Sequence, residues 1–200
     1  ATMDAYSAAY LGSTEVYGER IAPFGADALT VNGYLGTDGI EPALKTGGSI
    51  FVLVKTSNKS SGELQDRRLC DGKTIYETMG DMCEKWGEKY MGSYGYSAVG
   101  AVVGATYPAM LAEMREKLPH TFFLVPGYGA QGGGAEGVAK GFDENGLGAI
   151  VNSSRAIMCA YKKEGCDEHD YAGAARREAL RMKEDITSHI PAIKAPSQDK

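Results

Sequence analysis

The residues best suited to chemistry lie in a glycine-rich segment, 121–134, which reads TFFLVPGYGAQGGG. Four apolar residues, 122–125, end at Pro126, and the loop that follows holds five glycines and one long polar side chain, Gln131. Because glycine has no side chain, the backbone N–H groups of such a loop can approach an anion closely. We therefore interpret this segment as a buried strand followed by a phosphate-binding loop.

The glycine spacing of this loop also fits the G-x-G-x-x-G pattern of dinucleotide-binding proteins. In those proteins the next strand ends in an acidic residue that holds a ribose, about 20 residues downstream. Here the next apolar stretch, 148–153, is followed by Ser154 and Arg155, and only helices are expected after it. We therefore favour an arrangement in which two consecutive strand ends, the 126–132 loop and the Ser-Arg pair, bind one phosphate, as is common in (β/α)8 barrels.

The elements that must position these residues alternate along the chain. Apolar stretches with the composition of strands lie at 28–34, 49–55, 97–105, 121–125 and 148–153. Helical patterns lie at 1–11, 40–46, 62–69, 73–90, 109–118, 135–142, 156–162 and 169–190. This alternation predicts an α/β fold with a parallel sheet and right-handed crossovers. Five βα units in 200 residues correspond to part of a (β/α)8 TIM barrel.

Nothing in the sequence marks a domain boundary, so residues 1–200 are expected to form a single domain, the C-terminal part of such a barrel. Residues 60–95 are expected to form a helical insertion. The polar residues 191–200, which include two prolines, are expected to form a flexible tail. Because the chain opens on helical residues, the three remaining units are expected to precede Ala1.

Composition narrows the class of protein. The net charge is −5 and no basic cluster is longer than the pair 176–177, which argues against nucleic acid polymers and anionic membranes as partners. No apolar run has membrane-spanning length, so we expect neither a membrane span nor a signal peptide. The four cysteines form no C-x-x-C pair and the three histidines have no metal-ligand spacing, so we expect no metal site and reduced thiols in a cytoplasmic protein.

Five motifs, in order along nearly the whole chain, resemble the orotidine 5′-phosphate decarboxylase family, in particular the longer bacterial subfamily called type 2. They are VNGYLGTDGIEP at 31–42, KTSNKSSGELQ at 55–65, GAVVGATYP at 100–108, FFLVPGYGAQGG at 122–133 and AIVNSSR at 149–155. The resemblance implies a (β/α)8 barrel, of which this chain supplies strands four to eight. It also implies a homodimer with shared active sites, and conversion of orotidine monophosphate to uridine monophosphate and CO2 in de novo pyrimidine biosynthesis without metal or cofactor.

The resemblance also implies roles for residues at the strand ends. Gln131 would bridge the phosphate and the pyrimidine, and Arg155 would pair with the phosphate, assisted by the N–H groups of Ser154 and Arg155. Pro126 would line the base pocket. Ser57 would contact the amide edge of the pyrimidine.

The chain departs from the family in its acid-base residues. The family carries an Asp-x-Lys-x-x-Asp run on its third strand, and no strand of this sequence has that pattern. The resemblance therefore implies that the catalytic lysine lies before Ala1 and that this segment alone is inactive. Thr2 would be the threonine that follows the run and reaches into the partner's site. Lys55 lies two residues before Ser57, so their side chains are expected on the same face of the strand. Lys55 either points inward to a carboxylate or extends along the strand end to solvent.

Each site residue also has a structural alternative. Gln131 could simply cap its loop, although a long amide among five glycines favours a function. Arg155 opens a helix, where a cation opposes the helix dipole, so a nearby anion explains it better than a chance surface position. Ser57 could equally be the N-cap of a following helix.

Two other functions remain open at this point. The chain could belong to a different phosphate-binding barrel enzyme, such as an epimerase or an aldolase-like lyase acting on sugar phosphates. It could also be a non-catalytic, phosphate-binding half-barrel if its 200 residues are the whole protein.

Overall fold

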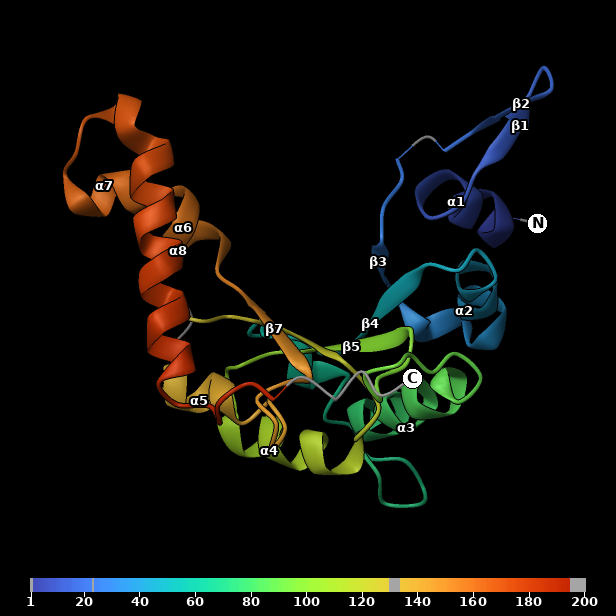
Figure 1. Cartoon of the computed structure of the whole chain (residues 1–200). Coiled ribbons are helices and arrows are strands. Elements are labelled where there is room, and N and C mark those ends of the chain that lie inside the picture. Colours follow the sequence, from blue (N-terminus) through green and yellow to red (C-terminus); the bar gives the residue numbers. More distant parts are fainter. Residues whose placement is uncertain (1, 23, 130–133, 195–200) are drawn as a thin grey trace.

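A computed structural model describes residues 2–22, 24–129 and 134–194. Its centre is a five-stranded parallel sheet whose strands follow one another in sequence order (Figure 1): β3 (Ala28–Val31), β4 (Ser49–Lys55), β5 (Val99–Val103), β6 (Phe123–Pro126) and β7 (Ala149–Asn152). Each strand therefore pairs with the next one along the chain, as in the wall of a (β/α)8 barrel. The predicted α/β class and all five predicted strands are confirmed.

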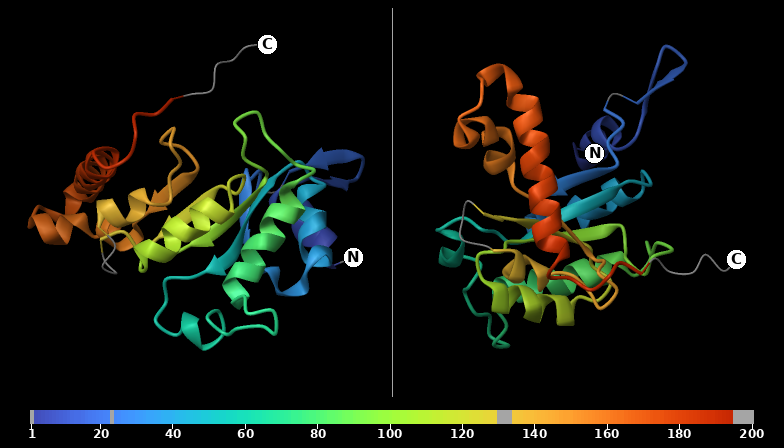
Figure 2. Two further views of the ribbon diagram at one scale, coloured as in Figure 1. Left: turned by 90° about the horizontal axis from the view of Figure 1, so that it is seen from below. Right: turned by 60° about the vertical axis from the view of Figure 1, so that its left-hand side comes forward.

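Helices connect the strands and lie side by side on one face of the sheet (Figure 2): α2 (Thr37–Leu44), α3 (Ile75–Gly87), α4 (Pro108–Lys117) and α5 (Ala135–Ala139). Three more helices follow β7: α6 (Ser154–Met158), α7 (Ala160–Glu164) and the long α8 (Tyr171–Thr187). The first helix, α1 (Thr2–Tyr10), lies at the β3 end of the sheet, far from α8 (Figure 1).

The core lies between the sheet and these helices, and β5 is its centre. All five residues of β5, the middle strand of the sheet, are buried. At Gly100 an added Cβ would lie 2.6 Å from the Phe51 ring and 2.7 Å from the Phe122 carbonyl oxygen, so only glycine lets the strands approach this closely. From the helix side, Leu111 and Leu118 are fully buried against the sheet.

Arg115 holds the edge of the sheet at which the strands begin. This buried side chain donates hydrogen bonds to the carbonyl oxygen of Leu118 at the end of α4, and to those of Thr121 (2.9 Å) and Gly148 (3.2 Å), just before β6 and β7. Its guanidinium lies 4.1 Å from the centre of the Phe123 ring. Burial lowers the pKa of Arg115. The opposite edge, at which the strands end, is left for binding.

Three segments differ from the sequence expectations. Residues 62–69 do not form the predicted helix; they contain the 3-10 turn Ser61–Glu63 and further turns, because Gln65 folds back onto the end of β4. The predicted helix 156–162 is interrupted at Cys159, which separates α6 from α7. No sequence pattern indicated the hairpin of β1 (Thr14–Val16) and β2 (Glu19–Ile21).

The expected insertion and tail are described only in part. The 60–95 region consists of turns followed by α3, so the predicted second helix in it is present and the first is not. Of the expected tail, residues 195–200 lie outside the described ranges, while the N–H of Lys194 donates to the carbonyl of Asn145 at 3.0 Å.

Candidate functional site

The carboxyl ends of β6 and β7, together with the end of β4, enclose a polar cavity of about 220 Å³. Its lining residues all follow these strands or end them: Ser57, Pro126, Gly127, Tyr128, Asn152, Ser153, Ser154 and Arg155. Active sites of (β/α)8 barrels lie at this edge, because the loops that follow the parallel strands meet there. The structure thus brings together four of the predicted site residues, Ser57, Pro126, Ser154 and Arg155.

The two other predicted site residues are not in this cavity. Gln131 lies outside the described residues. Thr2 is an exposed residue of α1, at the β3 end of the molecule (Figure 1). Its proposed role in a partner subunit's site remains a prediction.

Ser57 is held at the cavity by the neighbouring strand. The N–H of Gly104, just after β5, donates to the carbonyl oxygen of Lys55 at 2.7 Å. A Cβ added to Gly104 would lie within 3.0 Å of the Ser57 backbone, so glycine is required for this close approach. No helix begins at Ser57, and the N-cap of the 3-10 turn that follows is Ser60. The alternative that Ser57 is a helix N-cap is therefore wrong.

The start of the glycine-rich loop is fixed by Tyr128 and Ser153, two residues whose role no sequence pattern indicated. The buried hydroxyl of Ser153 donates to the carbonyl oxygen of Tyr128 at 2.8 Å. The Tyr128 ring is 4% exposed, and its hydroxyl donates to the Asp185 carboxylate on α8. Burial, and then the bond to Asp185, raise the pKa of Tyr128, so its phenol stays a donor at neutral pH.

The loop itself needs glycine at its first turn. Gly127 and Gly129 have φ angles of 102° and 79°, in the region that only glycine adopts readily. The carbonyl oxygen of Pro126 accepts a hydrogen bond of 3.0 Å from the N–H of Ala105, which follows β5. Together with the bond from Ser153 to Tyr128, this hydrogen bond joins the ends of β5, β6 and β7 at one edge.

Arg155 gives the cavity its positive charge. It stands in the first turn of α6, where the leading N–H groups have no acceptor within the helix. Within the described part of the chain, no carboxylate forms an ion pair with Arg155, and none of the described lining residues is acidic. A free guanidinium beside unpaired N–H groups is well suited to a phosphate.

Lys55 does not extend to solvent, so that alternative is wrong. The residue is 2% exposed, and its Nζ lies 2.6 Å from the Asp66 carboxylate and 3.4 Å from the Ser61 hydroxyl. The carboxylate partner that an inward-pointing lysine needs is thus supplied by the segment after β4. Lys55 is not among the residues that line the polar cavity.

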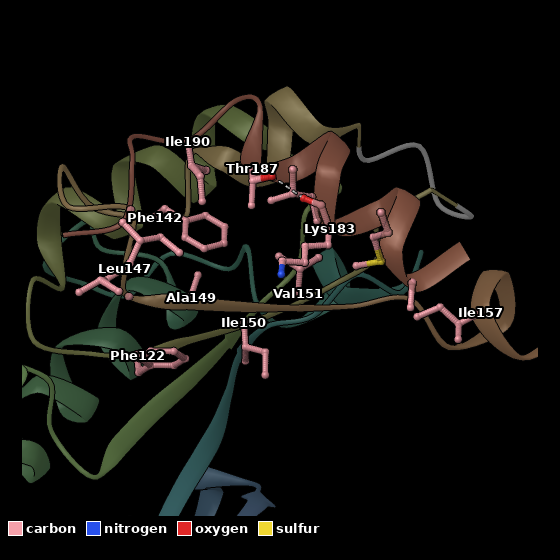
Figure 3. A pocket seen from close by; sticks show the side chains of 16 residues that line it. Phe122, Phe142, Leu147, Ala149, Ile150, Val151, Ile157, Lys183, Thr187 and Ile190 are labelled. Atoms are coloured by element: carbon pink, nitrogen blue, oxygen red, sulfur yellow. Dashed lines mark hydrogen bonds between the residues drawn. The ribbon is translucent and has the colours of Figure 1, made fainter. Parts of the chain in front are cut away.

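A larger cavity, of about 460 Å³, lies between β7 and α8 and is a poor phosphate site (Figure 3). Its walls are apolar side chains such as Phe142, Val151 and Ile190. Of its described lining residues, Lys183 and Thr187 carry the polar side chains, and the Thr187 hydroxyl is already bonded to the Lys183 carbonyl oxygen at 2.8 Å. Apolar walls of this kind suit a hydrophobic element rather than an anion.

Among the described residues, no three His, Cys, Asp or Glu side chains are grouped so as to hold a metal ion. No helix there combines the length and apolarity needed to cross a membrane.

Comparison with known proteins identifies the family of the chain. Residues 11–165 match the model of the orotidine 5′-phosphate decarboxylase / HUMPS family. The chain is 47% identical over 193 residues to an orotidine 5′-phosphate decarboxylase of Rhodopirellula baltica, covering 92% of this chain and 63% of the relative. It is 45% identical over 191 residues to that of Caldicellulosiruptor bescii, covering 92% and 61%. The chain thus spans slightly less than two thirds of the length of these relatives.

Among solved structures, the OMP decarboxylase of Leishmania donovani superimposes with a TM-score of 0.69 at 29% identity, covering 93% of this chain and 63% of that one. The match to the family model includes β3 to β7, the described part of the 121–134 segment and the Ser-Arg pair of α6. The chain belongs to the orotidine 5′-phosphate decarboxylase / HUMPS family and forms part of a (β/α)8 barrel.

Proposed function

We propose that this chain carries the substrate-binding part of an orotidine 5′-phosphate decarboxylase, which converts orotidine monophosphate to uridine monophosphate and CO2. The observation that carries the proposal is the polar cavity in which Ser57, Pro126, Ser154 and Arg155 meet. Arg155 and the N–H groups at the start of α6 bind the phosphate. Ser57 and Pro126 contact the pyrimidine, and Gln131 bridges the two ends of the nucleotide.

Binding of the phosphate contributes to catalysis at a distance. The phosphate does not react, so its contacts accelerate decarboxylation only if they favour the transition state over the bound substrate. Closure of the loop after β6 over the nucleotide is one way to achieve this. Because decarboxylation leaves a carbanion-like C6, a proton donor is also required, and the sequence has no Asp-x-Lys-x-x-Asp run on a strand. We place that donor in a preceding part of the polypeptide.

We further propose that the chain supplies strands four to eight of a barrel of the type 2 subfamily. The relatives are longer than this chain, which covers 63% and 61% of the first two. Strands β3 and β7 each pair on one side within the described sheet, so each has an edge at which a further strand can add.

A homodimer is the assembly that gives Thr2 a role. Exposed aromatic and aliphatic side chains, Tyr6, Tyr34 and Leu35, line a cavity beside α1, a surface suited to a protein partner. In such a dimer Thr2 would reach the partner's cavity. The four free cysteines fit a reducing, cytoplasmic location, and no nucleic acid polymer is proposed as a partner.

The test is decarboxylation by the full-length protein, followed as loss of orotidine monophosphate absorbance, with Arg155→Ala as the variant. We expect kcat/KM to fall roughly 30- to 1000-fold, because a charge-assisted phosphate contact is lost. This corresponds to a loss of about 2 to 4 kcal/mol of transition-state stabilisation. Arg176→Ala, an exposed arginine of α8, is the matched control and should behave as wild type.

Two outcomes would count against the proposal. An unchanged kcat/KM in Arg155→Ala would remove this residue from the site. Absence of turnover in the wild-type protein, with phosphate binding that still depends on Arg155, would instead favour a barrel enzyme that acts on another phosphorylated substrate.

A further inference from the structure

A buried lysine at the end of β4 has no place in the proposed contacts with substrate. Lys55 is among the largest fully buried side chains of the described chain. Its Nζ lies 2.6 Å from Asp66, and 5.6 Å and 5.8 Å from the ring centres of Tyr76 and Tyr107. Its neighbours therefore come from the segment after β4, from α3 and from the loop before α4. A charge buried in this way is costly unless it is paired, so its position calls for an explanation.

The segment after β4 folds back so that it brackets Ser57. The N–H of Thr56 donates to the Gln65 side chain at 3.0 Å, and the Gln65 amide donates to the Thr56 hydroxyl at 2.8 Å. On the other side of Ser57, the carbonyl oxygen of Asn58 accepts from the N–H of Ser61 at 3.1 Å. Ser57 thus lies between two residues that are hydrogen-bonded to the returning segment.

The Lys55–Asp66 pair fixes where this returning segment lies. Asp66 follows Gln65 directly, and its side chain is 48% exposed, so few packing contacts define its position. The buried ammonium supplies what packing does not, because it is stable only with the carboxylate beside it. An apolar residue at position 55 would leave Asp66 free to turn to solvent.

We propose that Lys55 is a positioning residue: its ion pair with Asp66 holds residues 56–66 against the end of β4 and so sets where Ser57 meets the base of the nucleotide. The proposal rests on the proposed function, because it assigns the base to Ser57. Phosphate binding lies elsewhere, on α6 and the loop after β6. The lysine therefore governs contact with the base and not contact with the phosphate.

The test compares two probes, uridine monophosphate and ribose 5-phosphate, by calorimetric titration of the full-length protein. In Lys55→Met we expect affinity for uridine monophosphate to fall roughly tenfold, with affinity for ribose 5-phosphate within about twofold of wild type. Asp66→Asn should give the same selective loss. The double variant should lose no more affinity for uridine monophosphate than the weaker-binding single variant, because each single substitution already breaks the same ion pair.

The matched control is Lys73→Met. Lys73 forms an ion pair of the same length, 2.6 Å, with Asp81, but both side chains are about half exposed and neither residue lines the cavity. This variant should bind both probes as wild type does. The proposal would be overturned if Lys55→Met lost affinity equally for both probes, or lost affinity for neither.

Hydrogen exchange of the free protein gives a readout that needs no ligand. In Lys55→Met and Asp66→Asn, amides of residues 56–66 should exchange faster while those of β5 are unchanged, and unaltered exchange in 56–66 would overturn the positioning role. If the wild-type protein binds neither probe, the proposed function falls, and the exchange result still decides whether Lys55 holds this segment.

Discussion

At the scale of single residues, the site depends on side chains that fix the backbone of its loops. Ser153 bonds to the carbonyl of Tyr128, and Tyr128 bonds in turn to Asp185 of α8. The glycine-rich loop therefore begins from a point that is attached both to the end of β7 and to the last helix. A binding loop that closes on a phosphate needs a starting residue that is held in place in this way.

Tyr128→Phe tests this attachment, because it keeps the ring and removes only the hydroxyl. We expect the free energy of unfolding to fall by about 1 to 2 kcal/mol, since a hydrogen bond to a charged group is lost. Chemical denaturation of the full-length protein measures it. The control is Tyr171→Phe, which changes an exposed tyrosine of α8, the helix that carries Asp185. If both variants unfold like the wild type, the Tyr128 hydroxyl does not hold the loop to α8.

Four of the eight residues that line the cavity were predicted from the sequence. In a parallel sheet the residues that follow each strand meet at one edge, so the strand ends alone predicted that Pro126, Ser154 and Arg155 lie together, and the resemblance to the family added Ser57. Tyr128 and Ser153 could not be found in this way, because their roles depend on contacts with α8 and with each other, 25 residues apart in sequence.

At the scale of elements, α3 illustrates how a helix begins. Thr74 is its N-cap, and the Thr74 hydroxyl accepts from the N–H of Glu77 while the Glu77 carboxylate accepts from the N–H of Thr74, which forms a capping box. Lys117 of α4 donates to Glu77 at 2.7 Å. The bond from Lys117, followed by those from Thr74, lowers the pKa of Glu77 from 4.5 to about 2.

Glu77→Gln should therefore change how stability depends on pH. In the wild type, this carboxylate contributes its full stabilisation above pH 4.5 and loses it as the pH falls toward 2, because the unfolded chain binds the proton first. We expect the variant to be less stable by about 1 to 2 kcal/mol at pH 7, with a smaller difference at pH 3.

Urea denaturation at the two pH values measures this difference. Glu116→Gln, an exposed residue of α4, is the control and should differ little from wild type at either pH. A difference for Glu77→Gln that stays constant or grows as the pH falls would contradict the assigned contacts.

Elements were predictable where one strong local pattern decided them. The buried strands are continuous apolar runs, and α3 has both helical spacing and a capping box. Residues 62–69 were mispredicted because Gln65 and Asp66 bond to Thr56 and Lys55, a tertiary contact that outweighs helix propensity. The hairpin 14–21 has exposed strands, so no burial pattern marks it.

At the scale of the whole molecule, one edge of the sheet carries stabilising contacts and the opposite edge carries the candidate site. Arg115 donates hydrogen bonds to three backbone carbonyls between the end of α4 and the beginnings of β6 and β7, which stabilises the fold. The cavity with Arg155 lies where these strands end. Helices α2 to α5 cover one face, so loops at the second edge can carry binding residues without disturbing the core (Figure 2).

The most direct test of this account is a crystal structure of the full-length protein with uridine monophosphate bound. We predict the phosphate within hydrogen-bonding distance of the Arg155 guanidinium and the Ser154 N–H, with the uracil ring against Ser57 and Pro126. A nucleotide bound instead in the apolar cavity between β7 and α8, or with its phosphate away from α6, would contradict the assignment of the site.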